Sequence, residues 1–106
     1  MSNPFHTSKD EPSAEHGFKI FGDAYMLSIV RVLSGTAQRF NELQRSLGNI
    51  SPTTLTNRLK KLETFGLVTQ EKQTIDQLSV IYALTEKGKK MLPVLGAIET
   101  FSKKFL

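Results

Sequence analysis

Apolar residues along the chain fall first into blocks with the period of a helix. From Asp23 they recur at helical spacing until Gly35, and a second helix is predicted for about residues 39–47. The first of these helices is apolar on more than one side. It is therefore either central to the domain or covered by a partner.

A third helix and a β-hairpin follow. Ser51 is a good N-cap, Pro52 suits the first helical position, and Gly66 ends this helix near residue 65. The runs "LVTQEK" (67–72) and "SVIYAL" (79–84) are rich in β-formers and predict two strands joined by a longish tip.

A last helix is predicted over residues 86–105, capped by Thr85 and kinked or divided at Pro93. Residues 1–17 are polar and predict a flexible arm, which leaves residues 18–106 as the domain. The order helix, helix, turn, helix, hairpin, helix predicts a mainly α fold with a small β-hairpin, a winged helix-turn-helix.

Composition excludes several classes of protein. The 106 residues contain no cysteine, so disulfides and thiolate metal sites are excluded, and no apolar run reaches the length of a bilayer span. His6 and His16 lie in the arm without a third ligand, and no nucleophile stands beside a base. We therefore expect no enzyme activity, no cofactor, no metal and no membrane association, and a cytoplasmic location.

Charge gathers on one segment. Between Arg39 and Lys61 there are five basic side chains and a single acid, Glu42, which suits a polyanion such as DNA. A merely solvated face explains the same cluster, and Arg39 alternatively caps its helix or pairs with Glu42.

The third helix separates its side chains by face. Leu55, Leu59 and Leu62 share the buried side, and short hydroxyls, one amide and then cations occupy the other. We expect Thr53, Asn57 and Lys60 to point almost directly away from the core and Thr54 and Lys61 to lie on the outer flank. Thr56 and Arg58 are expected at the two edges between core and solvent. Short polar groups at a helix N-terminus can enter the major groove, where Asn reads adenine and Thr contacts thymine, while Lys and Arg meet phosphates. The alternative is that these groups only cap and solubilise. The candidate DNA contacts are Arg39, Ser51, Thr53, Thr54, Thr56, Asn57, Arg58, Lys60, Lys61 and Lys72.

The last helix carries an apolar stripe longer than one small core needs. Its first half, through Met91 and Leu95, can cover the domain's own core, whereas the second half needs another surface. We expect a homodimer interface, with intramolecular packing alone as the competing interpretation. Its candidate residues are Tyr25, Ile29, Val94, Ile98, Phe101 and Phe105.

The segments "RFNELQRSLGNISPTTLTNRLKKLETFGLV" and "IYALTEKGKKMLPVL" resemble the HxlR-type helix-turn-helix family of prokaryotic transcription regulators. The resemblance covers about residues 22–101. It implies a winged helix that dimerises through its first and last helices and binds a palindromic operator in double-stranded DNA to repress or activate genes.

Some positions depart from the family pattern. Asp23, Ala24 and Tyr25 stand where relatives usually have "GKW", and the cysteine through which several relatives sense electrophiles or oxidants has no counterpart. The sensing route is therefore absent or different, and the alternative signal is an unknown small-molecule effector. The hairpin has one cation, Lys72, against Glu71 and Asp76, so its hold on phosphate should be weak. A winged helix used as a protein-interaction module, without sequence-specific DNA reading, is therefore the alternative function.

Overall fold

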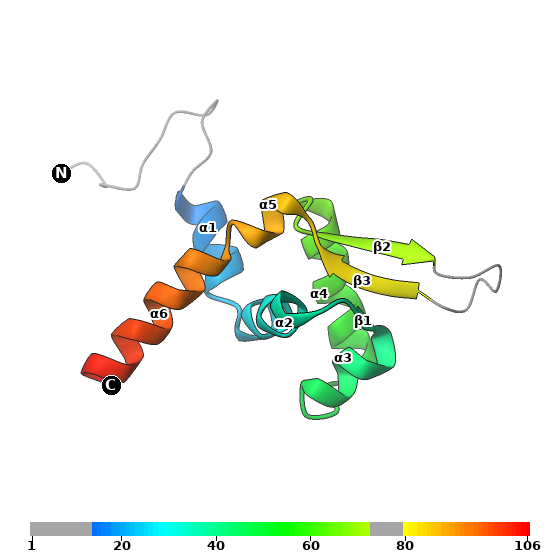
Figure 1. The fold of residues 1–106 in the computed structure, drawn as a ribbon, viewed down its shortest axis with the longest axis horizontal. Coiled ribbons are helices and arrows are strands. Elements are labelled where there is room, and N and C mark those ends of the chain that lie inside the picture. The colour runs from blue at the N-terminus through cyan, green and yellow to red at the C-terminus, as the bar shows by residue number, and fades with distance from the viewer. Residues whose placement is uncertain (1–13, 73–79) are drawn as a thin grey trace.

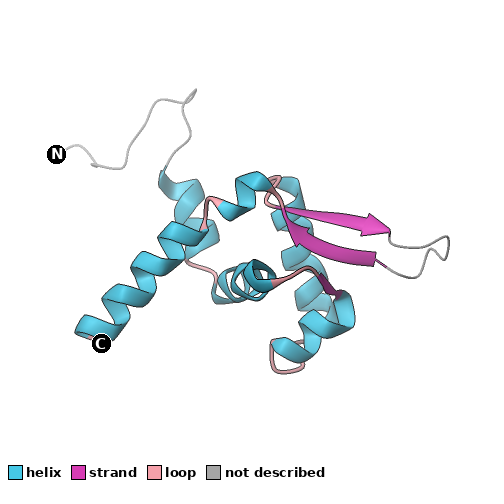
Figure 2. Cartoon of the chain, viewed as in Figure 1, coloured by secondary structure: helices cyan, strands magenta, loops and turns pink. Residues whose placement is uncertain are grey.

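The computed structural model describes residues 14–72 and 80–106, which form a helical body with a small sheet projecting from one side (Figure 1). The secondary structure is mapped in Figure 2. The elements in chain order are α1 (Ala14–Phe21), α2 (Ala24–Gly35), β1 (Gln38–Arg39), α3 (Phe40–Ser46), α4 (Pro52–Thr64), β2 (Val68–Lys72), β3 (Val80–Leu84), α5 (Glu86–Lys89) and α6 (Leu92–Phe105).

Helix α2 is the centre of the fold. It contacts α1, α3, α4, α6 and β3, which explains why its sequence is apolar on more than one side. Of the two interpretations of that pattern, the central one is confirmed. The expectation that Ile29 lies on an outer face is wrong, because its side chain is completely buried among the neighbours of α2. Helical spacing alone did not reveal which apolar side faces outward.

The core joins α2 to the two helices of the helix-turn-helix. Leu43 from α3 and Leu55 and Leu62 from α4 are fully buried, together with Ile29 and Val30 of α2. Burying an aliphatic side chain of this size contributes about 1.5–3 kcal/mol, so these contacts fix α3 and α4 on α2.

The sheet has three antiparallel strands in the order β1-β3-β2. The predicted hairpin is β2–β3, in which Val68 lies opposite Leu84 and Lys72 opposite Val80. The prediction missed β1, whose Gln38 lies opposite Tyr82. Two residues carry no strand period of their own, and β1 exists only through its pairing with β3.

The N-terminal boundary of the domain differs from the predicted one, whereas the last helix agrees with its prediction. Residues 14–17, assigned to the arm, form the first turn of α1, so the predicted boundary at residue 17 lies too late. Residues 1–13 lie outside the described residues. The last helix is divided as predicted: α5 ends at Lys89, and Pro93 lies in the first turn of α6, where its missing N–H is tolerated.

Candidate nucleic-acid interface

The turn between α3 and α4 is built from residues with left-handed backbone. Gly48 and Asn49 have φ of 70° and 58°, and their N–H groups donate to the carbonyls of Arg45 and Gln44 at 3.2 and 2.9 Å. These bonds satisfy the last carbonyls of α3. The Gln44 amide then donates to the carbonyl of Ile50, at 3.0 Å, so α3 holds the turn that leads into α4.

Helix α4 begins as predicted. The Ser51 hydroxyl accepts a hydrogen bond from the Thr54 N–H at 3.4 Å, and Pro52 occupies the first turn. Because Ser51 is exposed, its own O–H proton can still be donated to an approaching acceptor. Ser51 is thus a cap whose hydroxyl remains accessible from outside.

The outward side of α4 is one continuous polar stripe. Its residues follow the i, i+3, i+4, i+7 spacing of a single helix face, opposite the buried leucines. All of its members are exposed: Thr53, Thr56, Asn57, Lys60 and Lys61. We call these five residues the α4 stripe. Thr54, expected on this side, is half-buried, and Thr56, expected at an edge, is fully in the stripe.

Arg58 occupies the edge of α4 that faces α2. Its Nε lies 2.9 Å from Oδ2 of Asp23, and both side chains are largely covered, with exposed fractions of 27% and 21%. The guanidinium carbon also lies 5.9 Å from the centre of the Tyr25 ring, within cation–π range. Arg58 therefore has internal partners, unlike the lysines of the stripe.

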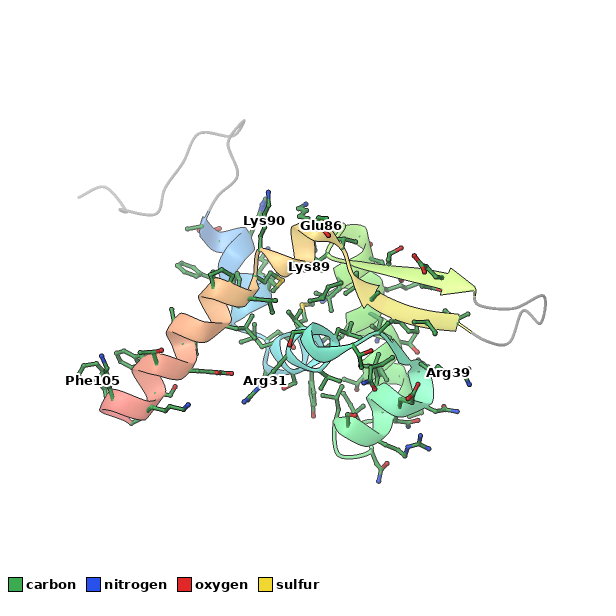
Figure 3. All side chains as sticks on the ribbon, in the orientation of Figure 1. Arg31, Arg39, Glu86, Lys89, Lys90 and Phe105 are labelled. Atoms are coloured by element: carbon green, nitrogen blue, oxygen red, sulfur yellow. The ribbon has the colours of Figure 1, made fainter. Side chains whose placement is uncertain are left out.

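Arg39 ends β1 and begins α3. Its backbone N–H donates to the Glu42 carboxylate at 3.0 Å, so Glu42 caps the helix through the backbone of Arg39. The Arg39 side chain is exposed and points away from the body (Figure 3). Within the parts of the chain that the structure describes, no ion pair includes its guanidinium.

The hairpin lies beside the C-terminal end of α4, with β2 in contact with that helix. Lys72, the hairpin's candidate phosphate contact, is the last residue of β2. The tip at residues 73–79, including Asp76, lies outside the described residues. The predicted weak hold of the hairpin on phosphate thus stays a prediction.

Two hydrogen bonds join the end of α4 to the start of α5, and their residues were given no role from sequence. The Lys87 ammonium donates to the carbonyl of Phe65 at 2.6 Å, and the Thr85 hydroxyl donates to the carbonyl of Gly66. Gly66 itself has φ of 73°, which ends α4. The motif "LT-x-x-G" (residues 84–88) was the sequence signal for this contact. Its glycine, Gly88, lets α5 come so close that a Cβ there would lie 2.1 Å from the carbonyl oxygen of Leu67.

Tyr82 lies in the middle of β3, between Gln38 and Gln70 on the neighbouring strands. Burial raises the pKa of its hydroxyl, and the nearby Glu63 carboxylate raises that pKa further. The hydroxyl therefore stays protonated at neutral pH and can act as a hydrogen-bond donor beside the end of α4.

An exposed apolar surface lies at the opposite end of the molecule. Four of the six residues predicted for dimerisation lie on α6 and are exposed, with fractions of 56% for Phe101 and 71% for Phe105. These two rings lie 5.2 Å apart and contact each other. Met91 and Leu95, by contrast, are buried in the core as predicted. The α6 surface consists of Val94, Ile98, Phe101, Phe105 and Leu106, of which the last was not predicted.

Other chemistries find little support in the described ranges. Within residues 14–72 and 80–106, no group of three or more His, Asp or Glu side chains could hold a metal ion. None of the helices there has both the length and the apolar character needed to cross a bilayer.

Sequence comparison finds helix-turn-helix transcriptional regulators. The model of the HxlR-like helix-turn-helix family matches residues 20–106. The uncharacterized HTH-type transcriptional regulator YvaP of Bacillus subtilis is 33% identical over 95 residues, covering 90% of this chain and 88% of the relative. The HTH-type transcriptional regulator YodB of the same organism is 31% identical, covering 89% of this chain and 84% of YodB.

Solved structures agree with the sequence relatives. The reduced form of YodB superimposes with a TM-score of 0.78 at 31% identity, covering 86% of this chain and 89% of the other. The redox regulator HypR in its reduced form gives a TM-score of 0.77 at 26% identity, covering 85% and 89%. The predicted winged helix-turn-helix fold is thereby confirmed, with a three-stranded sheet in place of a lone hairpin.

Proposed function

The chain belongs to the HxlR-like helix-turn-helix family of DNA-binding transcriptional regulators, which are not enzymes, and from that premise we propose how it binds. It acts as a cytoplasmic homodimer that recognises a palindromic operator in double-stranded DNA and represses or activates the genes beside it. Each protomer inserts the N-terminal half of α4 into one major groove.

The observation that carries this proposal is the α4 stripe. Thr53, Thr56 and Asn57 come first along the helix, and Lys60 and Lys61 follow on the same exposed face. Short hydrogen-bonding side chains at the front suit base edges, and cations behind them suit phosphates. Ser51 and half-buried Thr54 lie at the N-terminal end of α4. Arg39, before α3, and Lys72, at the end of β2, are further proposed DNA contacts.

A palindrome requires two such helices at a fixed spacing, because the symmetry of the operator mirrors that of the dimer. The α6 surface is available for this purpose, and Tyr25 at the start of α2 is exposed as well. The C-terminal half of α6 extends away from the body of the domain (Figure 1), which leaves it free to pack against the same helix of a second chain.

Selection of bound duplexes from a random library, followed by electrophoretic shift titrations, tests the proposal. We expect one enriched palindromic sequence, bound at least 10³-fold more tightly than random DNA at physiological salt. Lys60→Ala and Lys61→Ala should weaken binding to the operator and to random DNA by the same factor. Binding without any sequence preference would instead favour a winged-helix protein-interaction module, for which the paucity of cations on the hairpin argues.

A further inference from the structure

Arg58 differs from the other cations of α4 in having its charge already paired. The lysines of the α4 stripe are exposed and form none of the ion pairs in the described part of the chain. Arg58 lies 2.9 Å from Asp23, and its side chain is 73% covered, given an exposed fraction of 27%. A phosphate would have to displace Asp23 and uncover the guanidinium before Arg58 could bind it.

Asp23 serves two helices with its two oxygens. Oδ1 accepts the Met26 N–H at 3.0 Å and so caps α2, while Oδ2 accepts the Arg58 Nε at 2.9 Å. The positive end of the α2 dipole favours a carboxylate at this position. One carboxylate thus joins the N-terminus of α2 to the middle of α4.

The junction that carries Asp23 has little freedom. Gly22 donates to the Phe18 carbonyl at 2.7 Å, and a Cβ at Gly22 would lie 2.6 Å from that oxygen, so the last turn of α1 closes tightly just before Asp23. Tyr25, in the first turn of α2, has its ring centre 5.9 Å from the guanidinium carbon of Arg58. Arg58 is therefore held between a carboxylate and an aromatic ring on the same short segment.

We propose, on the basis of the DNA-binding function proposed above, that Asp23 and Arg58 are positioning residues for base recognition. Their ion pair sets the orientation of α4 on α2, and hence where the α4 stripe meets the base edges. Arg58 makes no phosphate contact in the complex. The pair links residues 35 positions apart, and it acts through the placement of a helix rather than through contact with DNA.

Two matched variants of α4 separate these roles. The slope of log K against log salt falls by about 0.9 for each phosphate contact that is lost. We expect Lys60→Ala to lower the slope by that amount per protomer and to leave the ratio of operator to random binding unchanged. Arg58→Ala should leave the salt slope unchanged and lower the ratio of operator to random binding about tenfold. That is the loss expected when one base pair is read poorly.

Asp23→Asn tests the pair from its other side and leaves α4 untouched. Asn is as good an N-cap as Asp, so α2 keeps its start while the charge attraction is lost. We expect the same tenfold fall in the ratio, and no further fall when Asp23→Asn and Arg58→Ala are combined. This variant also replaces Arg58→Ala should the latter fail to fold.

Two results would overturn the proposal. One is a salt slope for Arg58→Ala that falls as it does for Lys60→Ala, which would make Arg58 a phosphate contact. The other is an unchanged ratio for Asp23→Asn in a protein of native circular dichroism. Failure of the unmodified protein to prefer any operator would instead refute the proposed function, and it is seen before any variant is compared.

Discussion

At the scale of the residue, Asn57 is the side chain on α4 that is best suited to distinguish one base from another. Its amide offers both a donor and an acceptor, which matches the N7 and N6 edge of adenine in the major groove. It lies in the centre of the α4 stripe, exposed, with a threonine before it and lysines after it. The threonines add single hydroxyl or methyl contacts, and the lysines carry charge without reading sequence.

Replacing Asn57 with Ala should therefore cost roughly 1–3 kcal/mol on the selected operator and far less on random DNA. Fluorescence anisotropy titrations of both DNAs at one salt concentration measure the two losses. Asn41→Ala, at an exposed position of α3, is the matched control and should leave the ratio between the two DNAs unchanged. Equal losses on both DNAs would mean that Asn57 positions the helix rather than reads a base.

At the scale of the element, the sequence predicted a helix boundary correctly wherever a residue with its own backbone preference marked it. Ser51 and Pro52 began α4, Gly66 ended it, and Pro93 divided the last helix, each through its own backbone preference. By contrast, β1 depends on pairing with β3, and the outward face of α2 depends on which neighbours cover it. Local periodicity carries no information about either.

The candidate site divides in the same way. The α4 stripe follows from helical spacing, so four of its five residues were placed correctly, and only Thr56 was expected nearer the core. The partnership of Arg58 with Asp23 could not be foreseen, because it joins two helices distant in sequence. The exposure of Arg39 was also open, since nothing local decides whether Glu42 takes its backbone or its side chain.

The contact between α5 and the end of α4 gives a stability prediction. A Cβ at Gly88 would lie 2.1 Å from the Leu67 carbonyl oxygen, which is backbone and cannot move aside easily. Gly88→Ala should therefore lower the free energy of unfolding by about 1–3 kcal/mol, the usual effect of overpacking. Urea unfolding at a fixed protomer concentration measures the change.

Gly96 is the control for this experiment, since a Cβ built there would meet no atom within 4 Å apart from its chain neighbours and the adjoining backbone of α6. Gly96→Ala should leave stability unchanged or raise it by up to about 1 kcal/mol, because alanine is the better helix former. A Gly88→Ala variant as stable as Gly96→Ala would contradict the close contact between α5 and Leu67.

At the scale of the whole molecule, the two candidate surfaces lie far apart. Figure 3 shows Arg39 near the sheet at one end and Phe105 at the tip of α6 at the other. Helix α2 stands between them and contacts both α4 and α6. A change at the α6 surface can thus reach α4 through α2 and Asp23, which caps α2 and pairs with Arg58 of α4. A second route runs through α5, whose Lys87 donates to the Phe65 carbonyl at the end of α4.

The relatives that match most of the chain include YodB structures described as reduced, diamide-treated and quinone-bound. Diamide oxidises thiols, and these 106 residues contain no cysteine. We expect diamide treatment to leave the affinity for the selected operator unchanged, within a factor of about two, in the same titration. A larger loss of binding would mean that the protein has an oxidisable group other than a thiol.

The last prediction concerns the dimer, on which the reading of a palindrome depends. Phe101 is 56% exposed in the isolated chain, and burying its ring should contribute about 1.5–3 kcal/mol per protomer, or about 3–6 kcal/mol when counted twice by symmetry. Phe101→Asp should therefore weaken dimerisation by a hundredfold or more, because it also places two carboxylates at the interface. The expected product is a folded monomer that loses operator binding and keeps a weak affinity for random DNA.

Sedimentation velocity at tens of micromolar, paired with operator titrations, measures both effects. Thr100→Asp adds the same charge at a neighbouring exposed position away from the apolar stripe, and it should remain dimeric and bind the operator. If the unmodified protein sedimented as a monomer at this concentration, the α6 surface would not be a dimer interface. Two copies of α4 would then lack a fixed spacing, and recognition of a palindrome would have to be abandoned in favour of a single half-site or a protein partner.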